Sequence, residues 1–312
     1  MYTFRELGAE WLEYQKGYIK ESTFALYHYQ LNKYIFPVLG ELYLDDITEK
    51  VLQNMIFVLA NEQKSSLSEN SIKSILTLTR SCLKYGDVKG YAVYKNHRLR
   101  LPKTAKAPRQ IQTFNVREQK LIIASIIGDL SCKNFGILLS LYTGLRIGEV
   151  CALQWQDFDM ESRTLHVRKT VQRIYKCEGE SKEKTRLSIA APKTVTSIRE
   201  IPISSCIYDA ADELRSDRGT DYVLTNSEKV MEPRVYREFY HRFLERNHLR
   251  VLKYHSLRHT FATRCIEMGT DYKTVSELLG HANISITLNL YVHPDMEMKR
   301  KCVEKIYKDN EQ

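Results

Sequence analysis

Long apolar segments are missing from this sequence. No run of about 18 apolar residues, the length that a membrane-spanning helix needs, occurs anywhere in it. Charged side chains appear within the first six residues, which excludes the apolar core of a secretory signal. We therefore expect a protein that works in the cytoplasm.

Paired cysteines are missing as well. The chain has 7 cysteines, an odd number, and they are scattered without any C-x-x-C pair. This spacing argues against a disulfide framework and against a cysteine zinc site. We expect most of them to be buried thiols in a reducing compartment.

Acidic residues are too few to balance the basic ones. Among 312 residues there are 47 Lys and Arg against 38 Asp and Glu, which leaves a formal net charge of +9. A composition of 43% hydrophobic and 27% charged residues is typical of globular proteins, and at about 150 residues per domain the length indicates two domains. The basic excess permits a polyanionic partner such as nucleic acid without proving one.

Residues 1–94 predict a bundle of four amphipathic helices, because apolar residues recur at three- and four-residue spacings. The predicted stripe of the first helix consists of Phe4, Leu7, Trp11, Tyr14 and Tyr18. We expect the second helix to open at Ser22 and Thr23 and to be stopped by Pro37 with Gly40. The third should open at Thr48, and the fourth should end at Gly86.

Residues 95–110 form a basic linker between the two predicted domains. The segment holds six Lys and Arg and no acid, and prolines interrupt it. A solvated tether and a linker that lies against phosphates share this composition, so the run fits either interpretation. If the partner is nucleic acid, the candidate contacts are Arg98, Arg100 and Lys103.

The second predicted domain, residues 111–312, mixes helices with a few strands. A helix opens at Asn115, where Glu118 three residues later completes a capping pattern. Further helices, ended by glycines, are predicted near 138–142 and over 256–269 and 272–280, and three antiparallel strands over 164–174, 186–190 and 197–203. The predicted fold class is therefore mostly α with a small antiparallel β-sheet.

Four windows of this domain concentrate unusual chemistry. They contribute two guanidiniums, one ammonium, two imidazoles and one phenol, from Arg146, Arg258, Lys193, His255, His281 and Tyr291. The transition state of phosphoryl transfer needs forked donors on its non-bridging oxygens, an in-line nucleophile and an acid for the leaving oxygen. These side chains supply each part.

The windows TGLRIGE, HSLRHTFAT and LLGH, the last followed ten residues later by Tyr291, resemble the signature of the tyrosine recombinases, the phage-integrase family. Among them, integrases of conjugative transposons and prophages are the most similar in pattern. The helical N-terminal segment resembles that family's core-binding domain, and residues 111–312 its mixed α/β catalytic domain. The resemblance implies a site-specific DNA recombinase that cleaves and rejoins DNA through a 3′-phosphotyrosine, without metal or other cofactor, to integrate and excise a mobile element.

The resemblance also implies a role for each residue. Tyr291 would be the nucleophile, Arg146 and Arg258 would bind the phosphate, His255 would assist in accepting the tyrosine proton, His281 would hydrogen-bond the phosphate, and Glu149 would orient Arg146. For several of these residues a purely structural interpretation competes with the catalytic one. With 20 tyrosines in the chain, an arbitrary one is more often a packing residue. Arg146 could simply pair with Glu149, and His259, four residues after His255, suggests a zinc pair only weakly.

Two lysines are candidates for the general acid, the residue that protonates the 5′-oxygen. The family places its lysine in a β-hairpin turn, and Lys193, which precedes the last predicted strand, fits that turn best. Lys184 is the substitute if the strands pair differently.

The resemblance further implies partners. Four protomers would act on two duplexes that carry core recombination sites, with a directionality factor as a possible accessory. A terminal helix over residues 295–308 would dock onto a neighbouring subunit or onto its own. Many transposon integrases begin with an arm-binding domain, whereas this bundle begins near Tyr2, so we expect recognition of core sites alone or a domain missing from the sequence. A type IB topoisomerase and a non-enzymatic DNA-binding regulator on the same fold are the alternatives.

Overall fold

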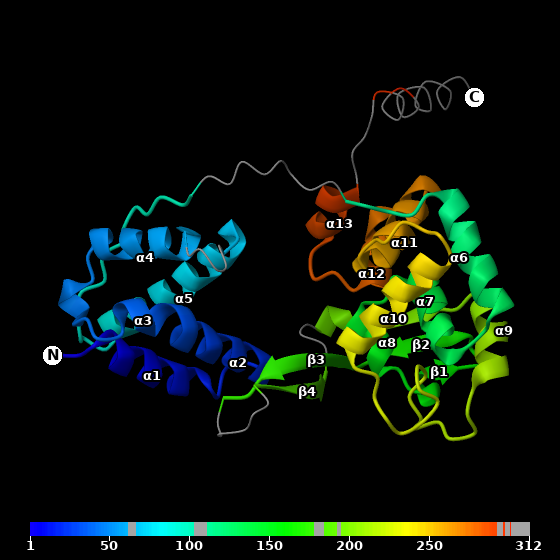
Figure 1. Cartoon of the computed structure of the whole chain (residues 1–312), viewed down its shortest axis with the longest axis horizontal. Helices are drawn as coiled ribbons and strands as arrows, with labels where there is room; N and C mark the ends of the chain where they lie inside the picture. The colour runs from blue at the N-terminus through cyan, green and yellow to red at the C-terminus, as the bar shows by residue number, and fades with distance from the viewer. Residues whose placement is uncertain are drawn as a thin grey trace, which may run out of the picture. The chain divides into compact units, whose positions relative to one another are not determined.

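The structure is a computed structural model, and it describes residues 1–61, 67–102, 111–177, 184–191 and 195–291, together with Met296 and Arg300. The chain divides into two compact units, each described below by itself (Figure 1). Unit 1 comprises Met1–Arg109 with Arg173–Arg186, and unit 2 comprises Gln110–Gln172 with Leu187–Gln312. The functional division into residues 1–94, 95–110 and 111–312 stays a prediction.

Unit 1 is a helical bundle. Its α-helices are α1 (Phe4–Gln15), α2 (Glu21–Gln30), α3 (Phe36–Leu39), α4 (Glu49–Asn61) and α5 (Glu69–Val88), and a π-helical turn, η1 (Leu31–Ile35), joins α2 to α3. Helix α1 packs against α2, α3 and α5, and α4 packs against α5. The apolar faces of these helices meet in one core, which includes Phe4, Leu31, Met55 and Ile75.

Three features of the bundle correct the sequence prediction. Tyr14 and Tyr18 are 50% and 74% exposed rather than part of the core, because α1 ends at Gln15 and the two rings pack on each other at the surface. Pro37 does not stop the helix, since it sits in the first turn of α3, where a proline costs no hydrogen bond; the helical run ends at Leu39, with the predicted Gly40 as its C-cap. Gly86 lies inside α5, and a Cβ there would lie 3.1 Å from the Leu7 side chain.

The starts of α1, α4 and α5 follow from side-chain capping. Thr3 and Ser68 accept backbone hydrogen bonds as the N-caps of α1 and α5, and Thr48 accepts one from Val51 as α4 begins. The second helix begins at Glu21, one residue before the predicted Ser22. Helix α2 begins after Lys20, which makes no side-chain cap.

Unit 2 contains the other described helices and the strands β1, β2 and β5, whereas β3 and β4 are each divided between the two units. The helices are α6 (Val116–Gly128), α7 (Cys132–Thr143), α8 (Ile147–Ala152), α9 (Ser205–Leu214), α10 (Pro233–Arg246), α11 (His255–Glu267), α12 (Tyr272–Leu279) and α13 (Ile284–Tyr291). Asn115 and Glu118 form the predicted capping box of α6. Helix α11 packs against α7, α12 and α13, which places distant parts of the sequence in one core (Figure 1).

The strands form two sheets rather than one. They are β1 (Phe158–Asp159), β2 (Thr164–Val167), β3 (Thr170–Tyr175), β4 (Thr185–Ala190) and β5 (Arg199–Pro202). The first sheet has the antiparallel order β1-β2-β5, with Leu165 opposite Ile201, and the second pairs β3 with β4. The predicted strand over 164–174 is thus two strands. The mostly α fold with small antiparallel sheets is confirmed.

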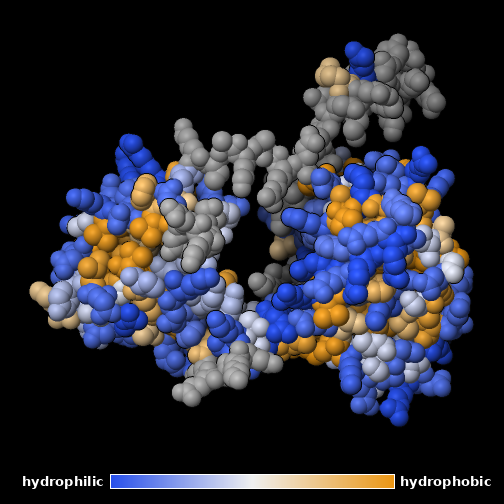
Figure 2. Space-filling model, in the orientation of Figure 1, coloured by the Kyte–Doolittle hydropathy of each residue, from blue (hydrophilic) through white to orange (hydrophobic). Residues whose placement is uncertain are grey.

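The surface of both units is mostly hydrophilic where Figure 2 displays it, with apolar residues showing between charged ones. Among the described residues, no helix is both long enough and apolar enough to cross a membrane. Of the described cysteines, Cys82 and Cys151 are buried, four others are half-buried, and all are free thiols.

Candidate active site

Gly144 makes the turn that brings two predicted arginines together. It ends α7 in the left-handed region, with φ at 66°, where glycine is favoured. A Cβ at this position would lie 2.7 Å from the side chains of both Phe261 and Leu279, so the turn also needs the missing side chain. The Gly144 carbonyl accepts a hydrogen bond from Arg258 Nη1 at 2.8 Å. Two residues later, Arg146 is the N-cap of α8.

Arg146 and Arg258 differ in exposure. Arg258, in the first turn of α11, is only 1% exposed. The Arg146 side chain is 36% exposed. Its Nη1 donates to Glu149 Oε1 at 2.6 Å, and its Nη2 donates to the Gly280 carbonyl at 3.2 Å. The guanidinium is therefore held in one place while part of it still faces solvent.

Glu149 is the buried anion of the site. It is 2% exposed, and its Oε2 accepts from the Arg146 backbone N–H at 2.9 Å and from Arg199 Nη2 at 3.0 Å. Burial alone would raise the pKa of this carboxyl, but Arg199 and Arg146 outweigh burial and hold the pKa below its ordinary value. Glu149 is therefore ionised, and it fixes Arg146 through both backbone and side chain.

His281 follows a second left-handed glycine. Gly280, with φ at 64°, ends α12, and the His281 N–H donates to the Ser276 carbonyl at 3.0 Å. His281 Nδ1 lies 2.8 Å from the hydroxyl of Thr287, a fully buried residue of α13. This hydrogen bond fixes the ring and leaves Nε2 as the other ring nitrogen for chemistry. Tyr291 is the last residue of α13, one turn after Thr287.

Both predicted histidines are neutral near pH 7. Burial, His259 and then Arg258 lower the pKa of His255 to about 4. Burial and then Arg258 and Arg146 lower the pKa of His281 to about 4 as well. A neutral imidazole has one nitrogen that accepts and one that donates a proton. Each ring can therefore take up a proton or hydrogen-bond an anion.

This pair predicts a loss of stability in mild acid. The unfolded chain would protonate both histidines at their ordinary pKa of 6.5, whereas the folded chain resists protonation until about pH 4. The unfolded state then binds more protons, so stability is complete above pH 6.5 and falls as the pH drops toward 4. Thermal melts at pH 7 and pH 5 measure this loss. In the double variant His255→Gln/His281→Gln, the loss of stability between pH 7 and pH 5 should be smaller than in the wild type. An unchanged loss would contradict the prediction.

The structure does not describe every predicted site residue. Lys193 and Lys103 lie outside the described residues, as does the side chain of Tyr291. Lys184 is exposed and precedes β4; its carbonyl accepts from the Lys176 N–H at 3.0 Å. The structure thus brings together Arg146, Glu149, His255, Arg258 and His281.

Arg98 and Arg100, which belong to the predicted linker, lie in unit 1 and are both exposed. Gln53 of α4 holds the backbone of Arg100 through two hydrogen bonds of 2.9 Å, to its N–H and its carbonyl. The backbone is therefore fixed while the guanidinium remains at the surface.

Arg199 is the residue that the sequence analysis missed. It begins β5 within the window SIREIPI, where only the strand pattern was noticed, yet it is buried and pairs with Glu149. One feature of the sequence could have revealed it. Arg199 stands two residues before Ile201 in the strand, so the basic side chain shares the buried face of that strand.

His255 and His259 contact each other without forming a metal centre. Their rings meet edge to face with centroids 4.5 Å apart. Within the described part of the chain, no three His, Cys, Asp or Glu side chains are grouped so that they could hold a metal ion.

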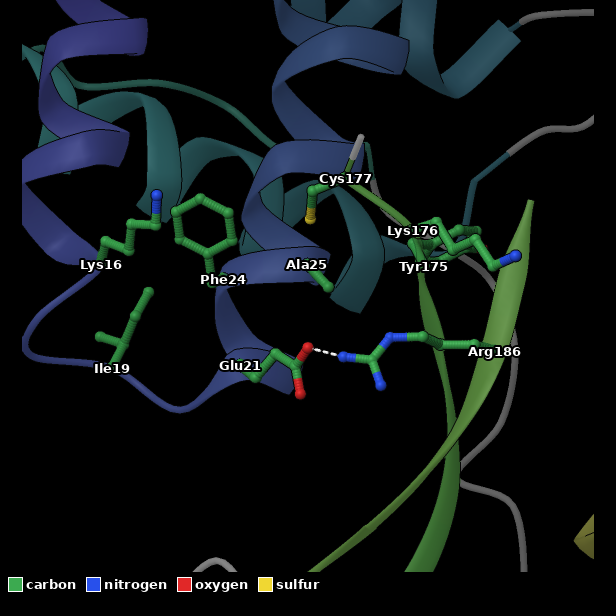
Figure 3. Close-up of a pocket in the computed structure, with 9 residues that line it drawn as sticks. All are labelled: Lys16, Ile19, Glu21, Phe24, Ala25, Tyr175, Lys176, Cys177 and Arg186. Atoms are coloured by element: carbon green, nitrogen blue, oxygen red, sulfur yellow. Dashed lines mark hydrogen bonds and ion pairs between the residues drawn. The ribbon is translucent and has the colours of Figure 1, made fainter. Parts of the chain in front are cut away.

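A pocket of about 470 Å³ in unit 1 contains none of the predicted catalytic residues (Figure 3). Lys16, Phe24 and Tyr175 are among its lining residues, and Glu21 pairs with Arg186 beside it. Nearby, Tyr175 stacks on Tyr29 with ring centroids 4.0 Å apart. We assign no part of the chemistry to this pocket.

Sequence comparisons match both parts of the chain. The model of the phage integrase family covers residues 115–298, and that of the SAM-like N-terminal domain of phage integrases covers residues 3–59. A XerC-like tyrosine recombinase of Caldanaerobacter subterraneus is 31% identical over 97% of this chain and 82% of its own length. The integrase of Staphylococcus phage L54a is 27% identical over 98% of this chain and 93% of its own length.

Solved structures share the fold. The Tn1549 transposon integrase in complex with a circular intermediate DNA matches with a TM-score of 0.79 and 20% identity, over 98% of this chain and 100% of that chain. The lambda integrase tetramer bound to a Holliday junction matches with a TM-score of 0.63 and 17% identity, over 93% of this chain and 78% of that chain.

Proposed function

This chain belongs to the phage integrase family of tyrosine recombinases, and we propose that it integrates and excises a mobile element by cutting and rejoining DNA at core sites. The observation that carries the proposal is the assembly around Gly144 and Gly280. There, Arg146 and Arg258 converge on two adjacent turns, with an ionised Glu149 and two neutral histidines beside them.

In the proposed reaction Tyr291 attacks the scissile phosphate. The tyrosine oxygen bonds to phosphorus, the P–O5′ bond breaks, and a 3′-phosphotyrosine and a free 5′-hydroxyl result. His255 is suited to accept the tyrosine proton because it is neutral near pH 7. The reverse attack by a 5′-hydroxyl of the partner strand rejoins the DNA, so no external energy source is needed.

The phosphate would be held by Arg146, Arg258 and His281. Two guanidiniums offer forked donors to the non-bridging oxygens, where negative charge grows in the transition state. The Arg146 guanidinium is preorganised for this role by Glu149 and by the Gly280 carbonyl. Lys193 is proposed as the acid that protonates the 5′-oxygen, with Lys184 as the alternative.

The proposed substrate is double-stranded DNA that carries core recombination sites. Arg98 and Arg100 are exposed on the linker, and together with Lys103 they are proposed to contact the sugar-phosphate backbone. Because the substrate is cellular DNA, we place the reaction in the cytoplasm.

We further propose that four protomers act on two duplexes and exchange strands through a Holliday junction. The likeness to the lambda integrase tetramer on such a junction supports this assembly at the level of the fold. The terminal helix predicted over residues 295–308 would dock onto a neighbouring subunit or onto its own. It lies outside the described residues apart from Met296 and Arg300. A directionality factor is part of the same proposal.

The two alternatives are less favoured. A topoisomerase of type IB would use a similar set of residues, but the relatives that match along most of the chain are named recombinases and integrases. A regulator without catalytic activity would be expected to lack a motif residue, and this chain has all of them.

Strand exchange tests the proposal. The protein is incubated with a library of candidate junctions, and the recombined products are sequenced to identify its site. We then expect exchange between two duplexes that carry this site and none when one site is scrambled. Relaxation of supercoiled DNA at arbitrary positions, without exchange between sites, would favour the topoisomerase instead. Binding without cleavage would favour the regulator.

A further inference from the structure

Arg199 joins three segments that are far apart in the sequence. It begins β5, directly after the short 3₁₀ turn Val195–Ser197. Its side chain is 5% exposed. From this buried position it reaches Glu149 in α8 and the carbonyl of Leu278 at the end of α12.

The contacts of Arg199 use nearly all of its donors. Nε donates to the Leu278 carbonyl at 2.6 Å, and Nη2 donates to Glu149 Oε2 at 3.0 Å. Nη1 donates to the Ser197 carbonyl at 3.1 Å and to Glu149 Oε1 at 3.3 Å. An arginine side chain has five N–H groups, and four are engaged here. Arg199 therefore has at most one N–H group that could still bind a DNA phosphate.

The partners of Arg199 are bonded to, or lie next to, two of the three residues proposed to hold that phosphate, Arg146 and His281. Glu149 is also the partner of Arg146, whose Nη2 donates to the Gly280 carbonyl. Gly280 packs directly on Arg199, since a Cβ on this glycine would lie 3.1 Å from Arg199 Nη1. His281 is the next residue. One guanidinium thus supports both the carboxylate that orients Arg146 and the turn that presents His281.

We propose that Arg199 is a positioning residue for DNA cleavage, which acts through Glu149 on Arg146 and through the Leu278–Gly280 turn on His281. This inference rests on the proposed function. Arg199 does not contact the DNA itself, so its loss should slow the chemical step and leave the affinity for DNA almost unchanged. Supporting groups of this kind contribute about 10–100-fold where they orient ligands of a metal, and we expect a similar factor here.

The experiment measures covalent adduct formation in single turnovers, on a nicked duplex that carries the recovered site. The variants are Arg199→Met, Arg199→Lys, Glu149→Gln and the double variant Arg199→Met/Glu149→Gln. Arg250→Met is the matched control, because Arg250 also pairs with a carboxylate of unit 2, Glu118, at 2.6 Å, but away from these residues. Thermal melts check that each variant is folded.

We expect Arg199→Met to lower the rate at saturating DNA by about 10–100-fold with an unchanged dissociation constant. Arg199→Lys should recover only part of the rate, since a single ammonium cannot span Glu149 and Leu278 together. The double variant should lose less than the product of the two single losses, because both changes break the connection between Arg199 and Glu149. A wild-type rate in Arg199→Met, full recovery with lysine, multiplied effects in the double variant, or a loss confined to DNA affinity would each overturn the proposal.

A second measurement needs no DNA. The positive charge of Arg199 is among the causes that lower the pKa of His281. Titration of His281 followed by NMR should therefore give a higher pKa in Arg199→Met than in the wild type, and no change in Arg250→Met. If the wild-type protein forms no adduct with any DNA, the proposed function fails. The titration still tests whether Arg199 acts on His281, and an unchanged pKa would refute the coupling on which the positioning role depends.

Discussion

Tyr291→Phe is expected to bind core-site DNA as the wild type does and to form no covalent adduct. The substitution removes only the phenolic oxygen, which is the atom proposed to bond to phosphorus. A nicked duplex traps the adduct because the short 5′-hydroxyl strand diffuses away, so a denaturing gel reads the result directly. The expected effect is a complete loss of adduct at an unchanged dissociation constant.

Two controls accompany this variant. Tyr272→Phe removes a hydroxyl from another helix of unit 2, and it should cleave as the wild type does. A chelator should leave wild-type cleavage unchanged. An adduct formed by Tyr291→Phe would mean that a different tyrosine is the nucleophile. Loss of cleavage in the chelator would refute the proposal that no metal takes part.

Lys193→Ala is expected to slow cleavage by about 10²–10⁴-fold, the usual contribution of a general acid. Breaking the P–O5′ bond otherwise leaves an alkoxide, which is a poor leaving group near neutral pH. When sulfur replaces the 5′-bridging oxygen, the leaving group no longer needs a proton. Lys193→Ala should then cleave at nearly the wild-type rate, as measured in single turnovers.

The sulfur substrate also distinguishes acid catalysis from phosphate binding. Arg146→Ala should stay slow on it, because the non-bridging oxygens still need their donors. If Lys193→Ala also stays slow, Lys193 positions the phosphate rather than protonating the leaving group. If sulfur rescues Lys184→Ala instead, Lys184 is the acid.

Local signals in the sequence predicted much of the fold. The capping box of Asn115 and Glu118 and the glycines that end α11 and α12 fix helix boundaries through contacts of only a few residues. Such rules failed where packing decided the outcome. Gly86 continues a helix because Leu7 packs against it, and the rings of Tyr14 and Tyr18 remain at the surface although they continue the apolar spacing.

The sequence predicted which residues belong to the candidate site, but not how they contact one another. Motif windows named Arg146, Arg258 and His281, each by its immediate neighbours in the sequence. The sequence around Arg199 did not reveal its role, because that role depends on Glu149, which lies fifty residues earlier. The split of the strands into two sheets was missed for a similar reason, because pairing of β2 with β5 depends on segments that no local pattern connects.

The hydrogen bond from Arg258 to the Gly144 carbonyl closes a loop of 114 residues, and it has a consequence during synthesis of the protein. A ribosome adds about 5–20 residues per second, so several seconds separate the appearance of α7 from that of α11. During that interval Arg146 exists without Arg258, His281 or Tyr291. On the proposed mechanism, a nascent or prematurely terminated chain that stops before Tyr291 therefore lacks the parts needed to nick a chromosome.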